Sequence, residues 1–285
     1  RMAENGGVLE NAMQRMLRAM YLMVRGEWEP AQEALREFER HSAEVGDIWQ
    51  LEDTIVPFGV LTASAAGDTV ALKRAMTQLR VISKKVASMV LIERLARSLY
   101  LAHHGRATDV VAELEEVARR TPPLSEMLWM DIHTDLAFAY LSVGKLERAA
   151  AVCRETLASA RGEMRFTDIG IAFTHWVWSE AELGLGRPAE ALKILEALFV
   201  EIEPTGAPLL LGRSHGLRAL AKRALGDLEG CSRDLAQMRM YYARSGHPAL
   251  VASSERFGAD PSEVLLQSHS SNPPRGAELP QTMKR

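Results

Sequence analysis

The stretch WMDIHTDLAFAYLSVGKLERAAAVCRETL, residues 129–157, consists of two apolar runs on either side of a glycine at position 144. Apolar residues recur every three or four positions in both runs, as they do along one face of a helix. A glycine between two such runs is typical of the end of a helix, where it adopts a left-handed conformation without a steric clash. The stretch therefore predicts a helix, a tight turn and a second helix.

This pattern recurs along the whole chain. Glycines that follow one apolar run and precede another are spaced by 41, 38, 39, 42 and 40 residues: Gly26, Gly67, Gly105, Gly144, Gly186 and Gly226. Repeats of 20 to 50 residues that consist of a helix, a turn and a helix are the signature of a solenoid. We therefore expect an all-α, right-handed superhelical solenoid of about six helical hairpins over residues 8–268, with a C-terminal capping helix.

Two columns of small or apolar residues accompany the glycines. Seven residues before them stand Ala19, Val60, Ser98, Ala137, Ser179 and Ala219, and five residues after them Ala31, Leu72, Val110, Ala149, Ala191 and Cys231. Such residues allow the two helices of a hairpin to approach closely. The second hairpin departs from the pattern because Pro57 and Gly59 fall inside its first helix, where we expect a kink or an irregular turn.

The two ends of the chain have a different character. We expect a linker at residues 1–7, a short helix at 247–258, a further helix start at 260–263 (DPSE) and a disordered tail at 269–285, which is rich in Ser, Pro and Gly. The chain begins with Arg1, and repeat arrays need capped ends. We therefore expect it to be part of a longer protein that extends toward the N-terminus.

The composition is that of an ordinary globular domain. The chain has 285 residues, 47% of them hydrophobic, and a net charge of −3. It lacks the strongly basic stripe of nucleic-acid-binding proteins, a run of 18 apolar residues and a signal sequence. We expect a cytoplasmic protein with no nucleic-acid or membrane partner, and we expect its two cysteines, Cys153 and Cys231, to be buried thiols.

No catalytic or metal-binding motif is recognisable. The sequence contains neither a nucleophile elbow nor a phosphate-binding glycine loop. On a helix, His133 points away from Asp131 and Asp135, which lie two positions on either side of it. We therefore expect no metal, no cofactor and no enzymatic activity in this segment, and any catalytic domain would lie upstream of it.

The residues Leu136 to Tyr140 before Gly144, with Ala149 after it, resemble a tetratricopeptide repeat, and Trp178 to Gly186 begins a similar unit. The resemblance covers about residues 8–240. The period near 40 resembles the repeats of large bacterial signalling proteins, namely maltose-regulator-type activators and serine/threonine kinases with an AAA-type ATPase module. The resemblance implies a module that binds an inducer or a partner protein and restrains an output domain.

Basic residues form the most unusual columns of the alignment. Eleven and eight residues before the glycines stand Arg15, Arg94, His133, His175, His215, and Arg18, Arg97, Arg218. Stacked repeats would align them into a ladder that binds an acidic peptide, a phosphorylated segment or another anion. Alternatively, the cations form a solvated face or pair with carboxylates of adjacent hairpins.

Two further groups are candidates for binding or packing. Met13, Met16, Met20 and Met23 share one helix face, for which a core or intramolecular interface is favoured over an adaptable binding surface. Two tryptophans separated by Val177 point in different directions. We assign the second of them, Trp178, to the core, and Trp176 to the candidate groove.

The sequence favours a non-catalytic interaction or sensor module of a larger bacterial signalling protein. Its expected ligand is a peptide, a partner domain or a small anion, and the partner domain includes the case of an upstream kinase or ATPase domain of the same protein. A purely structural scaffold is the alternative, as is the C-terminal part of a serine/threonine kinase whose catalytic domain lies upstream.

Overall fold

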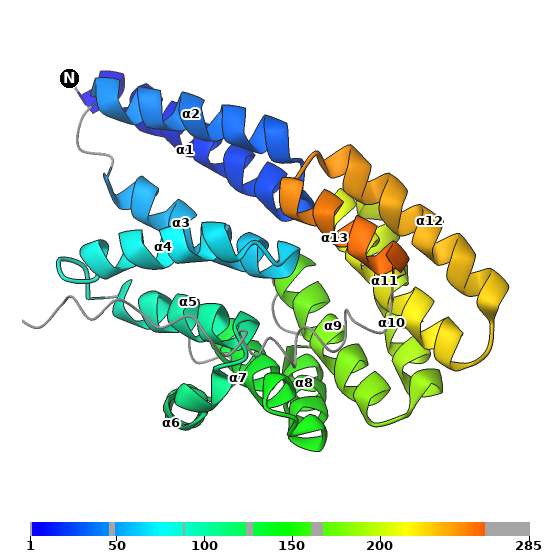
Figure 1. Ribbon diagram of the computed structural model, residues 1–285. Coiled ribbons are helices and arrows are strands. Elements are labelled where there is room, and N and C mark those ends of the chain that lie inside the picture. Colours follow the sequence, from blue (N-terminus) through cyan, green and yellow to red (C-terminus); the bar gives the residue numbers. More distant parts are fainter. Residues whose placement is uncertain (1, 46–48, 88, 124–127, 161–167, 260–285) are drawn as a thin grey trace, which may run out of the picture.

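The computed structural model describes residues 2–45, 49–87, 89–123, 128–160 and 168–259 (Figure 1). All regular secondary structure in these ranges is helical and they contain no strand, so the all-α prediction is confirmed. The elements are α1 (Met2–Arg25), α2 (Trp28–Val45), α3 (Trp49–Ala66), α4 (Thr69–Ile82), α5 (Met89–His103), η1 (Ala107–Asp109), α6 (Val111–Arg120), α7 (Trp129–Ser142), α8 (Leu146–Ala160), α9 (Asp168–Gly184), α10 (Pro188–Ile202), η2 (Glu203–Thr205), α11 (Pro208–Ala224), α12 (Leu228–Ser245) and α13 (Pro248–Ala259).

Consecutive helices pack in pairs. Helix α1 packs on α2, α3 on α4, α7 on α8, α9 on α10 and α11 on α12, whereas α5 packs on the short helix η1 that leads into α6. The predicted glycine stands in the turn of each pair, and all six glycines have φ between 67° and 83°. This confirms the left-handed conformation that the sequence predicted. Both columns of small residues are buried throughout, which confirms their predicted place between helices.

The first and last helix pairs of the array meet. Helix α1 contacts α11, and α3 contacts α9. The Arg213 guanidinium of α11 donates hydrogen bonds to the Ala65 carbonyl of α3 at 2.7 Å and to Glu180 of α9 at 3.0 Å. Arg25 of α1 likewise donates to the carbonyl of Thr205. The helix pairs therefore curl until the two ends of the array touch.

This closure places the middle helices in the core. Almost every side chain of α7 and of α9 from residue 169 to 182 is at least partly buried. This agrees with their sequences, because both helices carry apolar residues around most of their circumference. Trp129 and Trp176 are fully buried there, and the rings of Phe138 and Phe173 lie 5.7 Å apart. The core thus lies inside the curl as well as between the paired helices.

One contact of the array is missing. The second helix of most pairs packs on the helix that follows it: α4 on α5, α6 on α7, α8 on α9, α10 on α11 and α12 on α13. Across the described parts of α2 and α3 there is no such packed interface, and α3 is held instead by α1 and α4. This gap between the first two pairs matters for the site described below.

The structure differs from the sequence-based expectations at the start of the chain and at Pro57. Helix α1 begins at Met2, so residues 2–7 belong to a helix instead of the expected linker. Helix α3 is continuous through Pro57. The short helix expected at 247–258 is α13, whereas the expected helix start at 260–263 and the tail at 269–285 lie outside the described residues. None of the described helices is both long enough and apolar enough to cross a membrane.

Candidate groove between the first two helix pairs

The predicted basic ladder is divided among separate ion pairs. Arg15 and Arg18 of α1 lie 3.5 Å and 3.7 Å from Glu37 of α2. Arg94 and Arg97 of α5 lie 3.5 Å and 2.9 Å from Glu113 of α6 in the same way. In both cases, two cations one helical turn apart face a carboxylate on the next α-helix.

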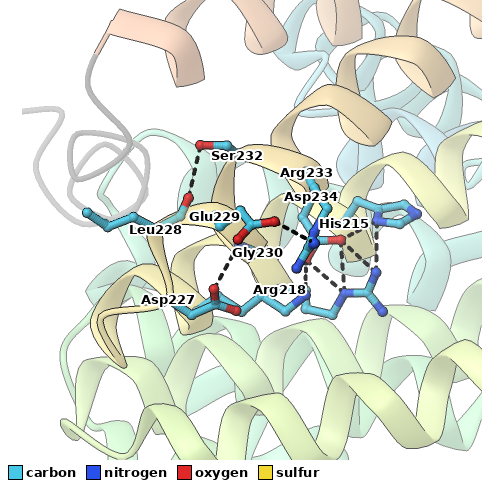
Figure 2. A network of polar contacts seen from close by, with 10 residues as sticks. His215, Arg218, Asp227, Leu228, Glu229, Gly230, Ser232, Arg233 and Asp234 are labelled. Carbon is cyan, nitrogen blue, oxygen red and sulfur yellow. Dashed lines mark hydrogen bonds and ion pairs between the residues drawn. The ribbon is translucent and has the colours of Figure 1, made fainter.

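The third group of ion-paired residues, on α11 and α12, is the most buried of the three (Figure 2). Asp234 of α12 accepts hydrogen bonds from His215 at 2.8 Å and Arg218 at 2.6 Å, and its second oxygen lies 2.8 Å from Lys222. Burial alone would raise the pKa of Asp234, but the hydrogen bonds from these three side chains outweigh it and hold that pKa far below its usual range. This cluster joins α11 to α12.

The remaining predicted site residues also have contacts inside the protein. His133 Nε2 lies 2.9 Å from the Thr121 carbonyl oxygen, and the buried His175 has Nδ1 at 2.9 Å from the Ile171 carbonyl oxygen. Trp176 is fully buried and donates to Ser214 Oγ, so its assignment to a groove is wrong. Trp178, which was assigned to the core, is the more exposed of the two.

The ladder residues do not line a common cavity. Of the predicted site residues, Arg97 alone lines either of the two cavities described below. The reason is geometric for the paired members: Arg15, Arg18, Arg94, Arg97, His215 and Arg218 face a carboxylate on the other helix of their own pair. The alternative interpretation expected pairs with carboxylates of adjacent hairpins, whereas these ion pairs join the two helices of one hairpin. Ligand binding by these side chains stays a prediction.

The methionines of α1 divide between core and surface. Met16 is buried, and Met20 and Met23 pack against the same small apolar cluster, as the core interpretation predicted. Met13 is 43% exposed and does not belong to that cluster. Met23, near the end of α1, also lines the larger of the two cavities described below.

A cavity of about 960 Å³ lies in the gap between the first two helix pairs. We call it the α2–α4 groove. Each of three helices contributes one row of lining residues: Trp28, Ala31, Gln32, Leu35, Phe38 and Glu39 from α2; Ile55, Val56, Gly59, Thr62, Ala63 and Ala66 from α3; and Ala71, Arg74, Ala75, Thr77, Gln78, Val81 and Ile82 from α4. Most of these side chains are apolar.

The spacing within each row gives the groove its length. Apart from Thr77, which also lines the smaller cavity on the other side of α4, the lining residues recur at intervals of three or four positions over 12 residues of each helix. That is one face of a helix over three turns, or about 16 Å at 1.5 Å per residue. The groove is therefore a channel along three helices and not a compact pocket.

One end of the groove is closed by the C-terminal helices. Leu209 of α11 and His247 and Leu250 at α13 line it there. The His247 ring lies against the Trp28 ring at the start of α2, and its Nε2 lies 3.8 Å from Asp68, the N-cap of α4. Burial lowers the pKa of His247, and the charge of Asp68 partly opposes this. Helices α2 and α4 therefore both begin at the closed end.

The α3 row offers little side-chain bulk. A Cβ atom built on Gly59 would meet no atom within 4 Å, and two of the other members are Ala63 and Ala66. Small residues on α2 and α4, such as Ala31 and Ala75, continue this surface. A helix backbone would be able to approach closely here, as it does where small residues separate packed helices.

Two charged side chains of the groove have no ion pair in the described part of the chain. They are Glu39 on α2 and Arg74 on α4, and both residues are exposed. Val81, on the same face of α4, is 58% exposed although it is apolar. A mostly apolar lining with charged side chains at its edge matches the apolar centre and polar rim of protein interfaces.

A smaller cavity of about 460 Å³ lies on the other side of α4, against α5 and η1. Three arginines line it, Arg80, Arg97 and Arg106, together with Glu93 and Asp109. Arg106 pairs with Asp109 at 2.7 Å, and Arg97 pairs with Glu113. Because carboxylates already satisfy two of its arginines, this cavity is a weaker candidate for anion binding than its arginine content suggests.

A buried acidic pair lies on α7, away from both cavities. Both carboxylate oxygens of Asp135 are buried without a hydrogen-bond partner among the described residues. Burial, and secondarily the charge of Asp131, raises the pKa of Asp135 well above its usual range, and burial raises the pKa of Asp131 to about 7. Within the described ranges, no three His, Cys, Asp or Glu side chains are arranged to hold a metal ion.

No protein-family model matches the chain, and no curated protein matches it.

The groove was not predicted from the sequence, because the residues of its rows have the spacing of ordinary core faces. The signal that pointed toward it was Gly59, which broke the repeat pattern and lies at the centre of the α3 row.

Proposed function

We propose that this chain is a non-catalytic protein-interaction module whose α2–α4 groove binds an amphipathic helix of a protein partner. The helix pairs and their glycine turns support a tetratricopeptide-like, right-handed solenoid of about six hairpins as its architecture. The resemblance of its repeats to those of bacterial signalling proteins suggests that it belongs to a larger protein of that class.

The observation that carries the proposal is that the described side chains of α2 and α3 share no packed interface. In most other pairs the second helix is covered by the helix that follows, whereas here a three-turn channel lined by apolar side chains takes the place of that contact. Amphipathic helices bind such channels through anchors at positions i, i+3, i+4 and i+7, which is the spacing of all three rows.

The shape of the groove favours a helix over a small molecule. Pockets for small ligands enclose about 300–1,000 Å³ and converge on a few well-placed polar groups. This groove is at the upper end of that range, and its few polar side chains, such as Gln32, Gln78 and Arg74, are spread along its length. A bound helix would contact the whole length, whereas a compact ligand would leave much of it uncovered.

Gly59 allows a sharp test. Its added Cβ has open space and its φ is not positive, so Gly59→Ala leaves the groove open and is expected to stabilise α3 by about 0.5–1 kcal/mol. Gly59→Phe places a ring in the groove. The probe is a fluorescein-labelled 18-residue amphipathic peptide with leucines at i, i+3, i+4 and i+7 in each heptad.

Fluorescence anisotropy is expected to show binding to the parent protein and to Gly59→Ala, and at least tenfold weaker binding to Gly59→Phe. Thermal melting is expected to show that both variants fold. A purely structural scaffold would bind no such peptide. Equal binding by Gly59→Phe and Gly59→Ala would contradict the proposed site.

A further inference from the structure

The charges along the groove are unevenly distributed between its two walls. Helix α4 contains Lys73, Arg74 and Arg80 and no acidic residue, and Lys84 and Lys85 follow it. None of these five cations has an ion pair among the described residues, although the net charge of the chain is −3. Of these five, Arg74 lines the groove and Arg80 lines the smaller cavity on the other side of α4, so the α4 wall presents one cation to the groove, Arg74, which is unpaired among the described residues.

The opposite wall, with the turn before α2, presents two acidic side chains to the groove, and one of them, Glu27, pairs with Arg25. The other, Glu39 of α2, is unpaired in the described structure, whereas Glu37, two residues before it, is held by Arg15 and Arg18 outside the groove. Unpaired charges on opposite walls select a partner with complementary charges, because a helix with like charges at those places would be repelled.

The two charges also lie at different depths. Arg74 is three residues beyond Ala71 at the closed end, which is about 5 Å along the groove, and Glu39 is 11 residues beyond Trp28, which is about 16 Å along it. Their separation along the axis is thus about 12 Å. A bound helix covers that distance in about eight residues, or two turns.

We infer that the partner helix carries an acidic side chain near the closed end, on the flank that faces α4, and a basic side chain about two turns away, on the flank that faces α2. This inference rests on the proposed function of the groove. Turning such a helix end for end would bring its basic side chain to Arg74 and its acidic one to Glu39. The two charges therefore fix the direction in which a given helix binds.

The experiment uses three amphipathic peptides with the same leucine positions. One has a glutamate and, eight residues away, a lysine on opposite flanks; the second has the two charges on the mirrored flanks; the third has glutamine at both places. Each is measured by anisotropy against the parent protein, Arg74→Gln and Glu39→Gln. Both substituted side chains are exposed, so the variants are expected to melt like the parent.

One of the two charged peptides is expected to bind about two- to fivefold more tightly per ion pair than the uncharged peptide, since exposed ion pairs contribute modestly. Double-mutant cycles should assign the gain to both Arg74 and Glu39, and 0.5 M salt should remove it. If all three peptides bind equally to the three proteins, the charge register is refuted while groove binding stands. If no peptide binds, the proposed function itself fails.

Discussion

The indole ring of Trp28 lies against the imidazole ring of His247, with 4.2 Å between the ring centroids. Trp28 is the first residue of α2, and His247 directly precedes α13, so this contact joins the first helix pair to the last helix. The same two side chains line the closed end of the α2–α4 groove. The shape of the candidate site therefore depends on contacts between the two ends of the array.

Acid is expected to weaken this junction through His247. Its pKa is lowered by burial in the folded state, so below about pH 6.5 the unfolded chain takes up a proton that the folded protein resists. That contribution to stability is lost as the pH falls. Urea unfolding at pH 7.5 and 5.5 should show a smaller acid-induced loss for His247→Gln than for the parent. The control is His104→Gln, an exposed histidine, and an identical loss in all three proteins would contradict the prediction.

Two glycines with the same backbone conformation are expected to differ in their tolerance of alanine. Gly67 has φ of 67° and open space around an added Cβ, so Gly67→Ala should cost about 1–2 kcal/mol from the left-handed backbone alone. Gly26 has φ of 76°, and its added Cβ would lie 2.4 Å from the Cβ of Leu209 on α11. Gly26→Ala should cost clearly more in chemical denaturation. Equal costs would mean that α1 and α11 do not touch in solution.

Replacement of the carboxylate by an amide is expected to destabilise the protein strongly at Asp234 and weakly at Glu113. Asp234→Asn leaves His215, Arg218 and Lys222 without their buried counter-charge and should cost about 3–5 kcal/mol at pH 7. Glu113→Gln breaks pairs that are nearly half exposed and should cost at most about 1 kcal/mol.

The pH dependence of Asp234→Asn provides a second check. Because the pKa of Asp234 is lowered in the folded state, its contribution is present above about pH 4 and is lost as the pH falls further. The difference between the parent and Asp234→Asn, measured by denaturant unfolding, should therefore shrink below pH 4. A difference that stays constant down to pH 2 would argue against the charged cluster.

A valine at position 135 is expected to stabilise the protein. Ala96, Val177 and Leu217 occupy the equivalent place nine residues before the glycines of other pairs, and all are buried. Asp135→Val removes a carboxyl group without hydrogen-bond partners among the described residues and should raise stability by about 1–3 kcal/mol at pH 8.

The sign of this effect follows from the raised pKa of Asp135. Between about pH 4 and the raised value, the unfolded chain loses a proton that the folded protein keeps, so the parent becomes less stable as the pH rises. The advantage of Asp135→Val should therefore be largest at alkaline pH and small near pH 4. Denaturant unfolding at pH 4, 6 and 8 measures it, and an unchanged pH dependence would show that Asp135 has a polar partner in solution.

The fold was predictable from the sequence where local rules decide the structure. Left-handed glycines such as Gly144 and buried small residues such as Ala137 follow from helix ends and close helix packing, which are encoded within about 40 residues. Of the ion pairs, the sequence alignment showed only the cationic members, as columns of Arg and His. Their acidic partners, such as Glu113 and Asp234, lie on the other helix of the pair, which these columns do not include.

The candidate site was not predictable because it arises from contacts far apart in the sequence. Trp28, Gly59 and His247 come from three separate segments, and nothing in their local sequence indicates that they meet. The two tryptophans of α9 show the same limit. Their divergence was correctly inferred from helix geometry, but which of them is buried depends on Ser214 of α11, to which Trp176 donates.

The hydrogen bond from Arg213 to the Ala65 carbonyl joins residues 148 positions apart, and that from Arg25 to Thr205 joins residues 180 positions apart. Open repeat arrays fold and fray locally, because each unit touches only its neighbours. A chain whose ends are tied to each other must close a very long loop before these contacts form, which slows folding. In return, neither end can fray alone, so this array is expected to unfold as a single cooperative unit and to tolerate neither the loss nor the insertion of one helix pair.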